Sequence, residues 1–137
     1  MTLREQLLLH EGLRLKPYRD TVGKWTVGVG RNLSDKGLTK VEALILLDND
    51  IVEAQRDLEK YLPWASTLDD ARYRVLVDMT FNMGIHGLLG FKRMLAALER
   101  GDYETAAAEM ESSKWAEQVG RRAHRLALWM RSGKVTP

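Results

Sequence analysis

The segment from Thr39 to Lys60 constrains the fold of this 137-residue chain more than any other. It opens on the capping-box pattern Thr39-Lys40-Val41-Glu42, and Pro63 follows its end. Its apolar residues recur at spacings of three and four and form one stripe: Leu44, Leu47, Ile51, Ala54 and Leu58. The segment therefore predicts one uninterrupted helix. At roughly 1.5 Å per residue that helix spans about 33 Å, which is long enough to connect two lobes.

A shorter helix is predicted before residue 12. Thr2-Leu3-Arg4-Glu5 is another capping box, Gly12 is placed to end the helix, and Pro17 prevents it from continuing. Leu3 and Leu7 lie on its apolar face, and a small lobe alone has too little surface to bury them. We therefore expect residues 1–11 to pack with the helical part of the chain.

The range 18–29 is predicted to form a β-hairpin. Gly23 supplies the turn, and from residue 25 to residue 30 apolar side chains alternate with threonine and glycine. In a strand this alternation places Trp25 and Val27 on one face and Thr26 on the other. A loop is expected at residues 34–37.

Residues 61–137 predict a series of helices. Ser66 or Thr67 is expected to cap the first, and Asp102 a later one. Glycines at 84, 87 and 90 are expected to interrupt the chain, and a final helix to run from about Arg121 to Met130. The expected fold class is therefore α+β and mainly helical. We expect a single domain, 1–137, with a small β-containing lobe at 12–38, a connecting helix at 39–60, and a helical lobe made of 1–11 and 61–137.

Composition is typical of a globular domain with a packed core. Hydrophobic residues make up 45% of the chain and charged residues 29%. The absence of cysteine excludes disulfides and thiolate chemistry. The apolar run near the N-terminus is short and interrupted by charge, and no stretch approaches membrane-spanning length. We therefore expect the chain to encode no route of its own across a membrane.

Positive charge gathers at the C-terminal end, although the net charge is only +2. From Lys114 to Pro137 the one acidic residue is Glu117. The basic residues there are Lys114, Arg121, Arg122, Arg125, Arg131 and Lys134. Such a segment suits an anionic polymer, either nucleic acid or an acidic cell-wall polysaccharide. A solvated helix face of a mildly basic protein explains it equally well.

Three residues near the N-terminus have the chemistry for cleaving a glycosidic bond. Glu11 ends the first helix, where the negative end of the helix dipole disfavours a charged carboxylate, as a general acid requires. Asp20 and Thr26 follow on the hairpin and supply a second carboxylate and a hydroxyl. Carboxyl groups about 6.5–9.5 Å apart leave room for a water and give inversion. An isolated glutamate and aspartate at this spacing are, however, more often ordinary surface charges.

A resemblance favours the catalytic interpretation. It is carried by residues 10–30, in which Glu11, Asp20 and Thr26 occur, and by three later stretches in the same order. These are Asp50-Ile51-Val52-Glu53-Ala54, Met79-Thr80-Phe81-Asn82-Met83-Gly84-Ile85-His86-Gly87-Leu88-Leu89-Gly90-Phe91, and residues 113–125 with Ser113-Lys114-Trp115 and Arg121-Arg122-Ala123-His124-Arg125. Together they cover nearly the whole chain and resemble glycoside hydrolase family 24, the phage-type lysozymes.

The resemblance implies a lysozyme-like fold and an N-acetylmuramidase. Such an enzyme hydrolyses the β-1,4 bond between N-acetylmuramic acid and N-acetylglucosamine in peptidoglycan. Glu11 would be the general acid, Asp20 the second catalytic carboxylate, and Thr26 the residue that positions the water, which argues for inversion. The resemblance implies no cofactor and no metal.

Other site residues follow from the same resemblance. Arg122 matches the arginine that pairs with the catalytic glutamate. Phe81 and Asn82 match positions that line the saccharide cleft. Asn32, Met94 and Glu109 match other substrate-contact positions, all three more weakly because their residue types differ from the usual ones.

The chain departs from the family pattern in two places. Arg31 replaces the usual histidine after Gly28-Val29-Gly30, and an acidic partner is expected on the helix after Pro63. The segment 33–39 is short, so the small lobe is expected to lack a strand and a short helix.

A phage endolysin of this kind is expected to wait in the host bacterial cytoplasm until the membrane is permeabilised, and then to act on the periplasmic wall as a monomer. Its basic segment would contact anionic wall or outer-membrane lipids, and nucleic acid is not an expected partner. Three alternatives remain open: a non-hydrolytic peptidoglycan-binding relative, a lytic transglycosylase that leaves anhydro-sugar ends, and a basic helical nucleic-acid binder.

Core packing is expected for the four tryptophans, and close backbone approach for Gly28 and Gly30.

Overall fold

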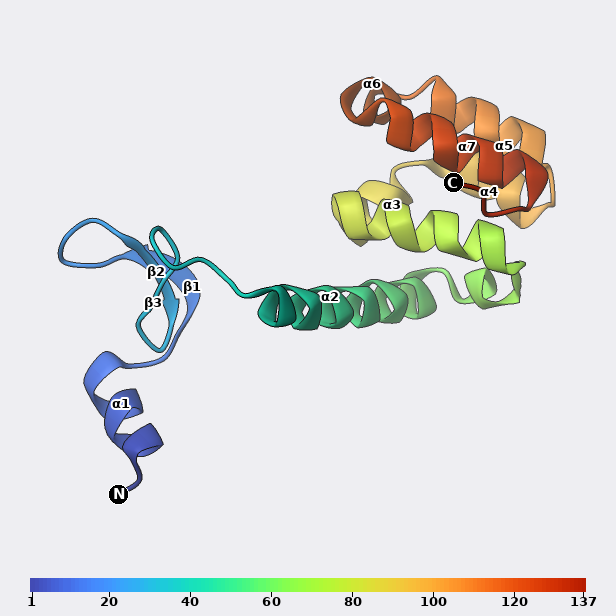
Figure 1. The fold of residues 1–137 in the computed structure, drawn as a ribbon. Coiled ribbons are helices and arrows are strands. Elements are labelled where there is room, and N and C mark those ends of the chain that lie inside the picture. The colour runs from blue at the N-terminus through green and yellow to red at the C-terminus, as the bar shows by residue number, and fades with distance from the viewer. The chain divides into compact units, whose positions relative to one another are not determined.

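The computed structural model describes residues 1–137 and is mainly helical, with one small antiparallel sheet (Figure 1). This confirms the predicted α+β class. By their internal contacts, residues 1–46 and 47–137 form two compact units. The assignment of residues 1–11 to a helical lobe stays a prediction. In order, the elements are α1 (Leu3–Glu11), β1 (Arg14–Arg19), β2 (Trp25–Gly28), β3 (Arg31–Asn32), α2 (Lys40–Tyr61), η1 (Pro63–Thr67), α3 (Asp70–Leu89), α4 (Lys92–Glu99), α5 (Tyr103–Glu111), α6 (Lys114–Val119) and α7 (Arg121–Ser132).

The helix α1 begins and ends where the sequence predicts. The Thr2 hydroxyl accepts from the Glu5 amide at 3.1 Å, and the Glu5 carboxylate accepts from the Thr2 amide at 2.8 Å. Together they satisfy two amide groups at the helix start. Gly12 ends the helix with φ +76°, and its N–H donates to the Leu8 carbonyl at 2.9 Å. Glu11 is consequently the last residue of α1.

The predicted hairpin is present, and a short third strand extends it. The strands are antiparallel in the order β1-β2-β3. Thr26 lies opposite Tyr18 on one side and opposite Asn32 on the other. Thr26 therefore occupies the central strand, and it is the one buried residue of the first unit, at 4% exposure.

The partner of Arg31 was predicted in the wrong place. The Arg31 guanidinium pairs with Glu42 at 2.7 Å, in the first turn of α2, and not with an acid after Pro63. Glu42 is already fixed there by its capping box, because it accepts from the Thr39 amide at 2.9 Å. These contacts hold the pKa of Glu42 at about 2, with the Arg31 hydrogen bond as the largest cause and the Thr39 amide next.

The start of α3 also differs from the prediction. Its N-cap is Asp69, whose carboxylate accepts from the Arg72 amide at 3.2 Å. Ser66 and Thr67 lie in η1 and donate to carbonyls of that turn. Of the glycines expected to interrupt the chain, Gly84 kinks α3 with φ +80°, whereas Gly87 stays within the helix and Gly90 follows its end.

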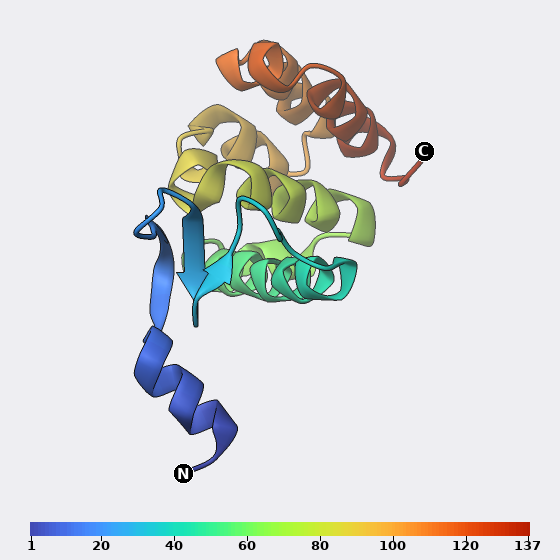
Figure 2. The ribbon, with the colours of Figure 1, turned by 60° about the vertical axis from the view of Figure 1, so that its left-hand side comes forward.

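The hydrophobic core lies entirely in the second unit. From residue 47 on, α2 lies beside α3, and α4, α5 and α7 pack together beyond it (Figures 1 and 2). The largest fully buried side chains there are Leu58, Leu76, Met79, Leu88, Met94, Leu98, Met110, Leu126 and Met130. None of the helices has both the length and the apolar character needed to cross a bilayer.

Three of the four tryptophans agree with the predicted core packing. Trp115 is buried, and Trp64 and Trp129 pack against the core from its edge. Trp25 is the exception, with 44% exposure. It lies on the surface of the hairpin, where the Arg19 guanidinium stacks on its ring at 4.4 Å.

Candidate active site

Glu11 lies against the backbone of the turn between β2 and β3. A β-carbon placed on Gly30 would stand 2.6 Å from Oε2 of Glu11, closer than any side chain tolerates. Gly30 also has φ +67°, a conformation that favours glycine. The predicted close approach is thus present at Gly30, whereas nothing lies within 4 Å of a β-carbon on Gly28. The last turn of α1 and the β2–β3 turn together place the carboxylate of Glu11.

Asp20 is held by the turn that joins β1 to β2. Its Oδ1 accepts from the amides of Val22 at 2.9 Å and Lys24 at 2.8 Å. The Asp20 amide in turn donates to the Lys24 carbonyl at 2.9 Å. The carboxylate is therefore fixed by its own turn, and its second oxygen has no protein donor.

Thr26 shares a partner with Asp20. Its hydroxyl donates to the Lys24 carbonyl at 3.0 Å, and the residue is 4% exposed. A buried threonine with its proton committed in this way has a fixed rotamer and an oxygen that can still accept. The side chains of Asp20 and Thr26 thus both hydrogen-bond the main chain of Lys24.

Asn32, predicted to contact substrate, lies next to Thr26 in the sheet. Its Oδ1 accepts from the Asp35 amide at 3.0 Å, and its Nδ2 donates to the Asp35 carboxylate at 3.2 Å. The Asn32 amide thus closes the turn after β3, and its substrate role stays a prediction.

Phe81 stands in α3 with 43% exposure, so its ring is available to a ligand. It borders an apolar pocket of about 360 Å³ whose wall includes Leu47, Ile51, Val77 and Trp129. It also borders a smaller pocket of about 250 Å³ lined by three carboxylates, Asp50, Glu53 and Asp57. No group of three or more histidine, cysteine, aspartate or glutamate side chains in the structure is arranged to hold a metal ion.

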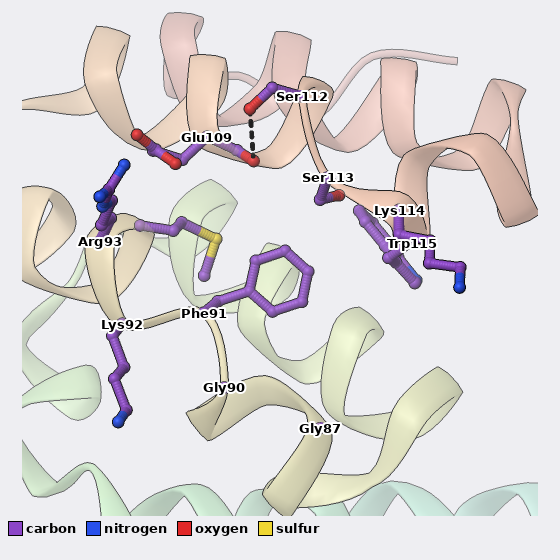
Figure 3. Close-up of a pocket in the computed structure, with 11 residues that line it drawn as sticks. Gly87, Gly90, Phe91, Lys92, Arg93, Glu109, Ser112, Ser113, Lys114 and Trp115 are labelled. Atoms are coloured by element: carbon purple, nitrogen blue, oxygen red, sulfur yellow. Dashed lines mark hydrogen bonds between the residues drawn. The ribbon is translucent and has the colours of Figure 1, made fainter.

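Asn82 anchors a buried aromatic side chain. Its Oδ1 accepts from Nε1 of Trp115 at 2.8 Å. The Trp115 ring meets Phe91 edge to face, with centroids 6.0 Å apart, and both rings line a pocket of about 580 Å³ (Figure 3). Arg93 and Glu109 lie at one end of that pocket in the figure, and Lys114 at the other. The amide N–H₂ of Asn82 has no protein acceptor and is available to a ligand.

Arg122, predicted to support the catalytic glutamate, has a carboxylate partner within the second unit. Its Nε donates to Oδ1 of Asp78 at 2.7 Å, and its terminal nitrogen reaches the same oxygen at 2.7 Å. A guanidinium has five N–H groups, and the two bonds to Oδ1 leave three of them. One of these three makes only a long contact to the Asp78 carbonyl, at 3.4 Å.

Sequence reasoning did not find Lys24, Asp78 or the contact of Glu11 with Gly30. Lys24 acts through its peptide groups, which no side-chain motif reports. Asp78 lies 44 positions from Arg122, and only the packing of α3 against α7 joins them. The glycine pair 28 and 30 was the one available signal for the Glu11 contact.

Comparison with known proteins identifies the family. The family model of phage lysozyme matches residues 9–132. The "Pre-baseplate central spike protein Gp5" of Enterobacteria phage T4 is 29% identical over 163 aligned positions, covering 98% of this chain but only 28% of that protein. "Probable T4-type lysozyme 1" of Dictyostelium discoideum is 28% identical, over 98% of this chain and 96% of that protein. The "Endolysin" of Acyrthosiphon pisum secondary endosymbiont phage 1 is 31% identical over 82% of this chain and 77% of that protein. The chain therefore belongs to the phage lysozyme family of glycoside hydrolases.

Proposed function

We propose that this enzyme hydrolyses the β-1,4 bond between N-acetylmuramic acid and N-acetylglucosamine in peptidoglycan, with inversion at the anomeric carbon. The observation that carries this proposal is the joint fixation of Asp20 and Thr26 by Lys24. A carboxylate and a hydroxyl that are both bonded to one residue are suited to bind one water. Glu11, on a separate element, is left to act as the acid.

In this mechanism the bond between the anomeric carbon and the bridging oxygen breaks, and its electron pair goes to that oxygen. Glu11 gives the oxygen its proton. The bound water attacks the anomeric carbon from the opposite face and passes a proton to Asp20. Asp20 also stabilises the oxocarbenium charge that develops in the transition state.

The test is digestion of purified peptidoglycan, with the anomeric form of the first product followed by NMR. Glu11→Gln should abolish hydrolysis while the circular dichroism spectrum stays unchanged. Glu59→Gln, a change at an exposed helical glutamate, should leave activity intact. Full activity of Glu11→Gln would refute the mechanism. Anhydro-sugar ends would instead show a lytic transglycosylase, and binding without products a non-hydrolytic relative.

We propose substrate roles for Phe81, Asn82 and Asn32, and support of Glu11 for Arg122. The exposed ring of Phe81 and the free N–H₂ of Asn82 suit an N-acetyl sugar. Because its guanidinium keeps N–H groups beyond those given to Asp78, Arg122 can serve a second carboxylate. Arg122→Lys should lower kcat strongly, since lysine lacks the planar fork. Arg56→Lys, on exposed α2 surface, is the matched control.

We propose that the basic C-terminal segment contacts an anionic wall polymer or outer-membrane lipid. Arg131 is already engaged by Glu104 and Glu111, so its charge is largely compensated. Exposed Arg121 and Arg125 have no carboxylate partner and supply the free charge. Replacing both with glutamine should weaken wall binding more than Arg131→Gln does. Equal binding by all variants would refute this contact.

We further propose that the enzyme is a monomer that reaches the periplasmic wall from the host cytoplasm after membrane permeabilisation. The relative named an endolysin supports action on the cell wall. Sedimentation of the purified chain as a monomer, and lysis from within only when a membrane lesion is supplied, are the expected results.

A further inference from the structure

Lys24 contacts Asp20 and Thr26, the two residues proposed to bind the attacking water, through its peptide groups. Its N–H donates to Oδ1 of Asp20 at 2.8 Å. Its carbonyl accepts from the Thr26 hydroxyl at 3.0 Å and from the Asp20 amide at 2.9 Å. One main-chain residue therefore fixes which atoms of Asp20 and Thr26 are free.

These bonds decide how a water can bind. The Thr26 hydroxyl has given its only proton to Lys24, so a water must donate to it. Oδ1 of Asp20 already accepts two N–H groups, which leaves Oδ2 as the free acceptor. A water that donates one proton to Thr26 and the other to Asp20 keeps its lone pairs free for the anomeric carbon.

Lys24 is itself held by the turn after β3. Its ammonium pairs with Asp35 at 3.1 Å, and Asn32 bonds that same aspartate through two contacts. The next peptide is held as well, because the Trp25 amide donates to Oγ of Ser34 at 2.8 Å. The hydrogen bond from Lys24, and then the one from Asn32, lower the pKa of Asp35, so the pair stays charged near neutral pH.

We propose that Lys24 is a positioning residue whose peptide groups orient the attacking water through Asp20 and Thr26, and that the turn of residues 32–35 keeps it in place. This inference rests on the proposed hydrolysis. The proposed orientation has a physical consequence. A nucleophile site with two hydrogen-bond acceptors, on Thr26 and Asp20, selects water, which has two O–H groups, over methanol, which has one.

The test replaces the Lys24 amide with an ester, which deletes its N–H and keeps its side chain. It measures hydrolysis of a peptidoglycan oligosaccharide in aqueous methanol. The glycosidic bond then breaks to give either a free sugar or a methyl glycoside. In the ester variant the ratio of methyl glycoside to free sugar should rise about fivefold, as expected for one lost hydrogen bond of about 1 kcal/mol. The value of kcat should fall while KM stays nearly constant.

Two controls separate positioning from general damage. An ester at Ala43 removes one helical N–H···O bond of the same unit, to Thr39, and should leave the product ratio unchanged. In the side-chain variants, Asp35→Ala should raise the product ratio, and Lys36→Ala, at the residue after that turn, should not. A smaller fraction of folded enzyme changes the rate but not the ratio.

Product ratios in the Lys24 ester and in Asp35→Ala equal to those of their controls would overturn the inference while leaving the proposed hydrolysis standing. Should the ester variant not fold, Asp35→Ala against Lys36→Ala decides the question. Absence of any cleavage by the unmodified enzyme would instead refute the proposed function.

Discussion

The carboxylate of Glu11 occupies the space that a side chain on Gly30 would need. The distance from that β-carbon to Oε2 would be 2.6 Å, against at least 3.4 Å for ordinary contact. Because Glu11 is the flexible partner, its carboxylate would move and the sheet would stay. Gly30 is therefore expected to control the position of the acid.

The first prediction compares Gly30→Ala with Gly28→Ala. Both positions have φ near +68°, at +67° and +69°, so both variants should lose roughly 1–3 kcal/mol of unfolding free energy from backbone strain. Only Gly30→Ala also displaces Glu11, which should lower kcat about a hundredfold. Urea unfolding and glycan cleavage measure the two effects. Equal activity of the two variants would contradict the role assigned to Gly30.

The sequence predicted α1, α2 and the hairpin because their signals are local. Both capping boxes form as expected, and the alternation from residue 25 places Thr26 in the sheet. The start of α3 was missed because Ser66, Thr67 and Asp69 are all good caps, and Pro63 favours a separate 3₁₀ turn before Asp69 takes the role. Local capping propensity does not decide which of several neighbouring residues becomes the N-cap of α3.

The site residues that carry the chemistry were predictable from the sequence. The residues that position those side chains were not. Glu11, Asp20 and Thr26 have the required functional groups and occur in a recognisable run. Gly30 and Lys24 act through backbone shape and peptide groups, which depend on the folded turn. The Arg31–Glu42 pair was also missed, since side-chain reach across a loop is not encoded in spacing.

The second prediction concerns pH. The pKa of Glu42 is lowered from its ordinary 4.5 to about 2 in the folded protein by Arg31 and Thr39. A lowered pKa stabilises the fold above the unfolded-state value, and this contribution is lost as the pH falls from 4.5 towards 2. The Tm difference between the unsubstituted protein and Glu42→Gln should thus be largest above pH 5 and shrink towards pH 2. A difference independent of pH would contradict this assignment.

The third prediction tests the Asn82–Trp115 hydrogen bond. Asn82→Leu leaves the indole N–H of a residue only 8% exposed without a partner, which should cost about 1–3 kcal/mol of unfolding free energy. Trp115→Phe should instead lower the free energy of unfolding because packing contacts of the larger ring are lost. The double variant should lose less than the sum of the single variants, because neither unpaired group then remains. Additive losses in a urea double-mutant cycle would show that the bond contributes nothing.

The fourth prediction concerns Arg72, which joins α3 to the end of α7. Its side chain is 12% exposed, donates to the carbonyls of Met130 at 2.8 Å and Arg131 at 2.9 Å, and stacks on the Tyr103 ring at 3.4 Å. A cation at the C-terminal end of a helix satisfies carbonyls that the helix itself leaves free.

Arg72→Met should therefore lower the free energy of unfolding by about 2–3 kcal/mol, since two charge-assisted hydrogen bonds and a cation–π contact are lost. Arg74→Met, on the same helix, removes only an exposed ion pair with Asp70 and should cost less than about 0.5 kcal/mol. Urea denaturation of both variants measures the difference. Similar losses would mean that the carbonyls at the end of α7 are as well satisfied by water as by Arg72, so that this contact between α3 and α7 would not stabilise the helical unit.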